Sequence, residues 1–198
     1  MLGRQVKKPR RRQGTSGVIL VGFMGAGKSS VGRAMAEQLG WTFEDLDDRI
    51  EQRAGRKVPE IFRDSGEAGF RRAEHTALRE LMQELQATPE KIVALGGGAF
   101  AQKENARLIE AGAVPTVFLD AAVEELWRRC RHQAEQEGIE RPLRGSHERF
   151  GELYEGRRRH YLKASFRQET GGKTIQEIAA EVIEALGLDR RRKKRGEK

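Results

Sequence analysis

The feature that most constrains this chain is a glycine-rich segment near its start, residues 22–29, which fits the pattern G-x-x-x-x-G-K-[ST]. It follows the apolar run Val18–Val21 and precedes Lys28–Leu39, a stretch with helical spacing. A strand, a tight loop and a helix start are the context that this pattern requires. Glycines let successive backbone N–H groups converge on a phosphate, and the helix N-terminus adds positive potential. The segment therefore predicts a site for a nucleoside triphosphate.

Two side chains at the end of this loop have defined tasks in such a site. We expect Lys28 to reach the β- and γ-phosphates, and we expect the Ser29 hydroxyl to bind Mg²⁺. A glycine-rich turn that matches by chance is the alternative, and the flanking strand and helix disfavour it. The remaining loop residues expected to contact the nucleotide are Gly25, Ala26, Gly27 and Ser30.

The composition suits one folded domain. The chain has 198 residues, of which 37% are hydrophobic and 34% are charged. No apolar run approaches the roughly 20 residues of a membrane span. Cys130 is the single cysteine, so no disulfide can form within the chain, which fits a reducing cytoplasm. We therefore expect one domain at residues 18–188 that works in the cytoplasm without a membrane.

The net charge of +8 comes from the two ends of the chain. Residues 1–17 carry six basic side chains and no acid, and residues 189–198 carry seven basic and two acidic ones, which leaves −3 for residues 18–188. We interpret both ends as basic, disordered tails without a specific nucleic-acid partner, because neither has an aromatic residue to stack on bases. Weak attraction to nucleic acid or acidic surfaces is the alternative, and an organellar presequence is another for the N-terminal end.

Strand and helix patterns alternate along residues 18–188, which predicts an α/β fold with a parallel sheet. Ligands then gather at the carboxyl ends of the strands. The expected strands are 18–21, 42–46, 91–95, 114–119 and 165–168. The expected helices are 28–39, 48–53, 59–65, 67–85, 103–111 with Gly112 as its end, 122–136, 147–163 and 174–186.

Acidic residues follow two of the expected strands. Asp45 and Asp47 are two apart, so in an extended chain they would face the same side, one near Mg²⁺ and one near an acceptor hydroxyl. Capping of the next helix by Asp47 or Asp48 is the alternative, and we prefer it for Asp48. Asp120 follows the fourth strand and is a second candidate for the metal.

Arginines and glycines supply the other candidates. Arg71 and Glu74 are three apart on a helix, so Glu74 can hold the guanidinium for a bound anion, although a weak surface ion pair fits equally well. The run Gly96–Gly98 directly after a strand favours close approach of a ligand over a flexible loop. Arg141, inside the polar loop 138–146, is a candidate to close over the phosphates. The four histidines lack metal-ligand spacing, and we interpret them as surface residues.

Taken together, these segments resemble the shikimate kinase family over about residues 18–188. The resemblance rests on GFMGAGKSS at 22–30, FEDLDDRIE at 43–51, GEAGFRRAE at 66–74, the glycines at 96–98, Arg141-Pro142-Leu143, and Arg157 four residues before Tyr161. It implies transfer of the γ-phosphate of ATP to the 3-hydroxyl of shikimate, on the way to chorismate and the aromatic amino acids. It also implies a three-layer α/β/α fold like that of nucleoside monophosphate kinases, with a five-stranded parallel sheet in the order 2-3-1-4-5 and a mobile lid at about 137–147.

The resemblance also assigns roles to individual residues. Lys28 and Ser29 would serve the phosphates and Mg²⁺, and Asp45 would be the acid near the metal, which lowers the case for Asp120. Asp47 would hold the shikimate hydroxyls. The catalytic residues would be Lys28, Asp47 and Arg141. The further contacts to shikimate would come from Arg71, Gly97, Gly98 and Arg157. The further contacts to ATP would come from Arg129, over the adenine, and from Arg141 in the lid.

Two features depart from the family pattern, and both lie in or beside the expected lid. Arg144 stands where the family commonly has leucine, and the segment between Arg129 and Arg141 is a few residues longer than in compact members. They affect the expected nucleotide affinity and lid closure, and leave the expected reaction unchanged.

Three rival functions remain to be weighed. A kinase for gluconate or a nucleotide would share the loop, and assays on those acceptors would separate it. A GTP-binding switch would need Asn-Lys-x-Asp, whereas Asn105 is the only asparagine and alanine follows it. A binding module without catalysis is disfavoured because the phosphate-loop and acidic candidates are all present. We expect a monomer whose partners are ATP, Mg²⁺ and shikimate.

Overall fold

The computed structural model of the chain describes residues 17–87, 90–137 and 146–188. Its centre is a five-stranded sheet with the strand order β2-β3-β1-β4-β5, and every pairing in it is parallel. This confirms the predicted fold class and strand order. The strands are β1 (Gly17–Val21), β2 (Thr42–Asp45), β3 (Lys91–Ala94), β4 (Thr116–Asp120) and β5 (Phe166–Glu169).

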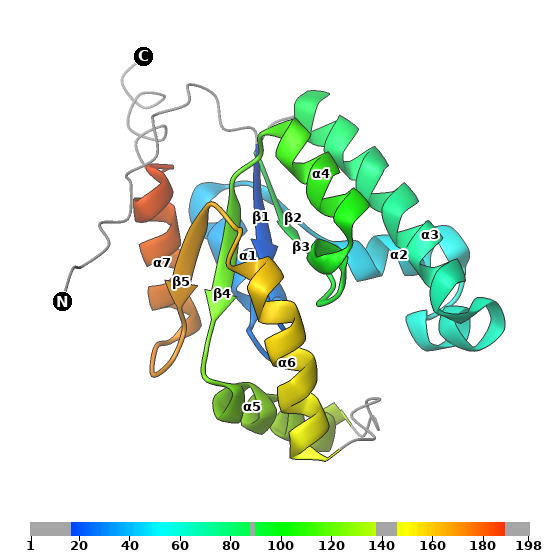
Figure 1. The fold of residues 1–198 in the computed structure, drawn as a ribbon. Helices are drawn as coiled ribbons and strands as arrows, with labels where there is room; N and C mark the ends of the chain where they lie inside the picture. Colours follow the sequence, from blue (N-terminus) through cyan, green and yellow to red (C-terminus); the bar gives the residue numbers. More distant parts are fainter. Residues whose placement is uncertain (1–16, 88–89, 138–145, 189–198) are drawn as a thin grey trace.

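Helices cover both faces of the sheet, which gives three layers (Figure 1). In that view α6 lies in front of the sheet and α1 behind it, and α7 packs against α1. The helices are α1 (Lys28–Leu39), α2 (Leu46–Ala54), α3 (Val58–Ala87), α4 (Lys103–Gly112), α5 (Val123–Glu137), α6 (His147–Tyr161) and α7 (Ile175–Leu186), with a 3₁₀ turn η1 (Ala99–Ala101) after β3.

The central strand explains why the candidate residues meet at one edge. The side chains of Val18–Val21 are fully buried, as expected for a strand covered on both faces. In the sheet register Leu20 pairs with Ala94 of β3, and Val21 pairs with Phe118 of β4. Asp45 pairs with Ala94 from the other side. The loops that follow β1, β2 and β3 therefore leave the sheet side by side.

Some element boundaries differ from the predicted ones. The two predicted helices around Ser65 form the single element α3, but Gly66 interrupts it with φ 64° and ψ −179°, so the predicted break is present. Helix α4 runs one residue further than predicted: Gly112 is its last residue, and Ala113, with φ 53°, is its C-cap. The Met82 methyl packs where a side chain at residue 112 would stand. The turn η1 was not predicted.

Several predictions fall partly or wholly outside the described residues. These are the tails at 1–17 and 189–198, of which only Gly17 is described, as the first residue of β1. Most of the predicted lid at about 137–147, including Arg141 and Arg144, also lies outside the described residues. The single domain at 18–188 stays a prediction.

Candidate active site

The glycine-rich loop joins β1 to α1 and leaves the first turn of α1 open. Gly25 and Gly27 have φ values of 78° and 84°, a backbone region that only glycine adopts readily. Gly27 is the N-cap of α1, and it makes no side-chain capping bond to the first-turn N–H groups of that helix. Those N–H groups and the positive end of α1 are the elements of an anion site. Lys28 lies over the loop, where its Nζ donates to the Phe23 carbonyl at 3.0 Å.

Asp45 connects this loop to the next strand. One of its carboxylate oxygens accepts a hydrogen bond from the Ser29 hydroxyl at 2.6 Å, and the other accepts from the Asp47 backbone N–H at 3.1 Å. Asp45 is thereby the N-cap of α2. The preferred interpretation of Asp48 as the cap was wrong, because the helix begins at Leu46 and Asp48 already lies in its first turn. Asp48 is exposed.

Asp47 lies close to Asp45, but not for the predicted reason. The strand ends at Asp45, so Asp47 stands on the first turn of α2 and no extended chain alternates between them. Its Oδ1 atom is buried and has no hydrogen-bond partner in the described part of the chain. Burial raises the pKa of Asp47 to about 6, Asp45 adds to the rise, and the Lys28 ammonium opposes it. A buried, unpaired carboxylate oxygen is costly unless a ligand uses it.

Lys28 belongs to the same electrostatic group. Burial lowers the pKa of its ammonium, while the charges of Asp45 and Asp47 act in the opposite direction. Arg157 also lowers it, which places a second cation within electrostatic reach of Lys28. The structure thus brings together a lysine from the glycine loop, an acid from the end of β2, an acid from the first turn of α2 and an arginine from α6.

Half-buried Arg71 pairs with buried Glu74, which decides between the two interpretations left open by their spacing. Glu74 is only 1% exposed, and Arg71 Nη1 lies 2.9 Å from both of its oxygens. Burial raises the pKa of Glu74, and Arg71 opposes the rise. Arg71 Nε is buried without a hydrogen-bond partner among the residues described. This is therefore no surface ion pair: Glu74 holds the guanidinium in a fixed place.

Two of the three glycines after β3, Gly96 and Gly98, make room for a site side chain, and Gly97 lies at ordinary contact distance from a third. A Cβ atom at Gly96 would lie 2.6 Å from Asp47 Oδ1, and one at Gly98 would lie 2.7 Å from Arg71 Nη2. A Cβ atom at Gly97 would lie 3.6 Å from Arg157 Nη1. None of the three has a positive φ, so the run is not needed for an unusual backbone. The close approach seen here is that of the chain's own side chains, and close approach of a ligand stays a prediction.

The other candidates have partners in the fold. Arg129 of α5 bonds to Glu125 and to the Thr170 hydroxyl and carbonyl at 3.2 and 3.1 Å, so it holds the turn after β5. Asp120 is buried and accepts from Tyr154, Arg158 and Arg167. Its carboxylate is thus used within the fold.

The histidines follow the prediction in part. His132 and His147 are exposed, whereas His75 and His160 are half-buried. His75 is bonded to the buried side chain of Asn105, with 2.8 Å between Nδ1 and Oδ1. Within the described ranges, no group of three or more histidines, cysteines or acids is arranged to hold a metal ion.

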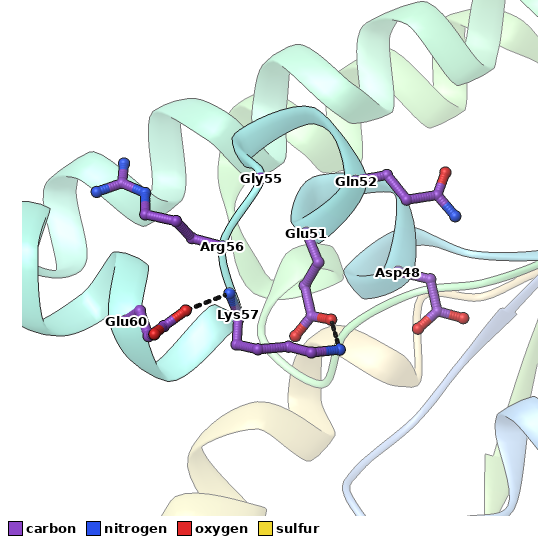
Figure 2. Close-up of a pocket in the computed structure, with 7 residues that line it drawn as sticks. All are labelled: Asp48, Glu51, Gln52, Gly55, Arg56, Lys57 and Glu60. Atoms are coloured by element: carbon purple, nitrogen blue, oxygen red, sulfur yellow. Dashed lines mark hydrogen bonds and ion pairs between the residues drawn. The ribbon is translucent and has the colours of Figure 1, made fainter.

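A separate pocket of about 370 Å³ lies where α2 turns into α3 (Figure 2). Its polar side chains largely satisfy one another: Glu51 accepts from Lys57 Nζ at 2.7 Å, and Glu60 accepts from the Lys57 backbone N–H at 2.8 Å. Asp48 lines this pocket, and none of the residues predicted for the nucleotide or acceptor site does. The pocket is therefore distinct from the cluster around Lys28. In the described part of the chain, no helix is long and apolar enough to cross a membrane.

Comparison with known proteins decides the family. The family model described as shikimate kinase matches residues 24–187. The chain belongs to the shikimate kinase family. A shikimate kinase of Persephonella marina is 37% identical over 168 residues, which cover 84% of this chain and 96% of that protein. A shikimate kinase of Cereibacter sphaeroides is 38% identical over 184 residues, which cover 93% of this chain and 87% of that protein.

Solved structures agree with this family. A shikimate kinase from Acinetobacter baumannii in complex with shikimate superposes with a TM-score of 0.77 at 30% identity, covering 88% of this chain and 94% of that one. The shikimate kinase of Aquifex aeolicus superposes with a TM-score of 0.71 at 31% identity, and the match covers 87% of this chain and 97% of that one. A gluconokinase of Sinorhizobium meliloti superposes with a TM-score of 0.57 at 21% identity, a likeness that extends only to the fold. The chain is an ATP-dependent kinase that phosphorylates shikimate, a step towards chorismate and the aromatic amino acids.

Sequence reasoning missed one residue of this cluster, Tyr161. Its hydroxyl donates to the Gly97 carbonyl, and its side chain is fully buried. The signal available in the sequence was its place four residues after Arg157, which puts both side chains on one face of α6.

Proposed function

We propose that the cluster around Lys28 is the catalytic centre of this kinase, with Asp47 as the group that takes the proton of the shikimate 3-hydroxyl. The observation that carries this proposal is the buried Asp47 Oδ1 atom, which lies against Gly96 and has no hydrogen-bond partner among the described residues. A pKa of about 6 leaves the carboxylate largely ionised at neutral pH and more basic than an ordinary aspartate. Both properties suit a group that accepts a proton as phosphoryl transfer proceeds.

The other residues take up the two substrates. Gly25, Ala26, Gly27 and Ser30 line the phosphates with backbone N–H groups, and Lys28 stabilises charge on the transferred phosphoryl group. Arg71 and Arg157 bind the shikimate carboxylate, helped by the Gly97 and Gly98 backbone, because a guanidinium matches a carboxylate with two parallel hydrogen bonds. Arg129 covers the adenine, and Arg141 closes over the phosphates.

Ser29 and Asp45 fit a magnesium ion. Both offer oxygen ligands, and their side chains already meet at 2.6 Å beside the loop. Magnesium in kinases is commonly held by one or two protein oxygens together with substrate phosphates and water, so a cage of several acids is not required. When bound with ATP, the ion neutralises charge on the β- and γ-phosphates. Asp120 is not part of this proposal, since its carboxylate is bonded within the fold.

Asp47→Asn tests the assignment most directly. Asparagine keeps the size of the side chain but cannot take the proton, so kcat should fall by roughly 10²-fold or more. ATP binding, measured by calorimetry, should persist because Lys28, Ser29 and Asp45 are unchanged. Asp48→Asn is the matched control: it is the same change one residue further on, at an exposed side chain, and it should leave kcat unaltered.

Two outcomes would contradict these roles. A near-normal kcat in Asp47→Asn would reduce Asp47 to a structural residue. Lost ATP binding would make Asp47 a metal-site residue, and the roles of Asp45 and Asp47 would have to be exchanged. Release of ADP with shikimate, gluconate and nucleoside monophosphates in parallel tests the acceptor.

The protein's setting is part of the proposal. We propose a monomer that works in the cytoplasm, in keeping with its single, buried cysteine, Cys130. Sedimentation of the purified enzyme tests the monomer, and a higher assembly at assay concentration would contradict it.

A further inference from the structure

A chain of hydrogen bonds joins helix α3 to the turn that follows the glycine run. His75 of α3 and Asn105 of α4 lie 2.8 Å apart, Nδ1 to Oδ1, and Asn105 Nδ2 donates to the Ala99 carbonyl at 3.2 Å. Asn105 is only 1% exposed. Ala99 is the first residue of the turn η1 and directly follows Gly98. A buried amide thus connects α3 with the backbone of the glycine run.

The direction of both hydrogen bonds follows from chemistry. The Ala99 carbonyl can only accept, so the NH₂ group of the Asn105 amide faces it. The amide oxygen then faces His75, whose Nδ1 atom carries a proton and donates it. A carboxylate at residue 105 could still accept from His75 but could not donate to Ala99, and an apolar side chain could do neither.

The glycine run meets α3 a second time, through Arg71. A Cβ atom at Gly98 would lie 2.7 Å from Arg71 Nη2, so the backbone of Gly98 and this guanidinium are packed closely together. Helix α3 therefore holds the loop at two points: Arg71 packs against Gly98, and His75 reaches Ala99 through Asn105. Together the two points fix the gap between the guanidinium and the loop backbone.

Backbone hydrogen bonds make the loop and its turn one unit. The Ala99 N–H donates to the Gly96 carbonyl at 3.0 Å, and the Ala101 N–H donates to the Gly98 carbonyl at 3.1 Å. A shift of Ala99 would therefore carry the glycine run with it. Helix α4, which has Asn105 in its first turn, packs against both α3 and η1.

We propose that Asn105 is a positioning residue for the acceptor site: it holds the Gly97 and Gly98 backbone at the distance from Arg71 that a substrate carboxylate needs. The proposal rests on the proposed roles of Arg71 and of this backbone in binding shikimate. A loop that is fixed before the substrate arrives costs less to order on binding. Loss of Asn105 therefore weakens binding of shikimate and spares ATP, which the loop after β1 binds.

Asn105→Asp replaces only the NH₂ group that bonds to Ala99 and keeps an acceptor for His75. We expect the KM for shikimate to rise on the order of 10-fold, the scale for loss of one buried hydrogen bond, and the KM for ATP to stay within about twofold. Asn105→Leu has a similar size and no polar atoms. It should raise the KM for shikimate at least as much, and it tests the proposal without a buried carboxylate.

Thr116→Val is the matched control. Thr116 is 5% exposed, and its hydroxyl accepts from the Ser165 N–H at 2.9 Å, at the amino end of β4 and so at the edge of the sheet away from the site. The variant should lower the Tm, because a buried hydrogen bond is lost, and leave the KM for shikimate within about twofold. An unchanged KM for shikimate in the folded Asn105 variants, an equal rise in Thr116→Val, or an equal rise in the KM for ATP would each overturn the positioning role.

His75→Leu breaks the same chain at its other end. It should raise the KM for shikimate by less than Asn105→Leu does, because Asn105 keeps its bond to Ala99. In the double variant, the KM should lie within about twofold of that of Asn105→Leu alone, since both changes act through one amide. Losses that simply add would contradict the link from α3 on which the proposal depends.

The same assays separate this inference from the proposed function beneath it. A wild-type KM for shikimate in Arg71→Lys would contradict the proposed acceptor site, and the inference would fall with it. A raised KM in Arg71→Lys together with a normal one in both Asn105 variants would contradict the inference alone.

Discussion

The glycine run after β3 yields a sharp prediction for Gly98→Ala. A Cβ atom at residue 98 would lie 2.7 Å from Arg71 Nη2 and 2.9 Å from Nη1, whereas ordinary contact begins at 3.4 Å. The guanidinium must therefore move by about 0.7 Å. It is the free end of a flexible side chain, so the fold can accommodate the methyl group. The move lengthens the bonds of Arg71 Nη1 to both oxygens of buried Glu74, each now 2.9 Å.

Displacement of this size should affect binding of the acceptor much more than stability. A misplacement near 1 Å can cost about 10²-fold in activity, so we expect kcat/KM for shikimate to fall roughly 10- to 100-fold. The KM for ATP should stay within about twofold. The longer bonds to Glu74 should cost about 1 kcal/mol of unfolding free energy, or roughly 3 °C in Tm. Steady-state kinetics with each substrate varied in turn, beside a thermal melt, measures all three.

Two further variants make this prediction refutable. Gly151→Ala in α6 is the control, because a Cβ atom there would meet nothing within 4 Å. It should keep wild-type kinetics and melt no lower than wild type, since alanine favours a helix more than glycine does. In the double variant Gly98→Ala with Arg71→Lys, the two losses should fall short of additivity, because both act on one guanidinium. A Gly98→Ala enzyme with a normal shikimate KM, or losses that simply add, would refute the steric reasoning.

Three other perturbations test separate parts of the molecule. Lys28→Met should abolish turnover with a native circular dichroism spectrum, since methionine keeps the stem without the charge, and measurable turnover at the wild-type rate would remove Lys28 from the mechanism. Arg71→Lys should raise the KM for shikimate more than that for ATP, because lysine loses the two-pronged fork, and an effect on ATP alone would contradict the carboxylate assignment. Arg49 and Lys91 lower the pKa of Glu84 to about 2 in the folded protein. The stabilisation that this ion pairing gives the fold is therefore complete above pH 4.5, the ordinary pKa of a glutamate, and is lost as the pH falls towards 2. Glu84→Gln should therefore lower the Tm at neutral pH and converge with wild type near pH 2, and a constant difference across that range would show that this ion pairing is irrelevant.

Local patterns in the sequence were enough to predict most of the strands and helices. The apolar strand, the glycine loop and the start of α1 lie where the motif predicted, and the break at Gly66 separates two helical pieces as expected. The parallel α/β class followed from the alternation of strands and helices. These features depend on local rules, because propensities, caps and glycine conformations act within a few residues along the chain.

The arrangement of the site depends on tertiary contacts, which spacing along the chain does not reveal. Spacing could not tell a buried Arg71–Glu74 pair from an exposed one, since burial depends on which elements cover α3. It placed Asp47 in extended chain at the end of a strand, whereas the helix begins one residue before it. Burial raises the pKa of Asp47, and the charge of Asp45 adds to the rise. The bond from Tyr161 to Gly97 spans 64 residues. Contacts of this kind are set by the packing of the whole sheet and its helices, which no short segment encodes.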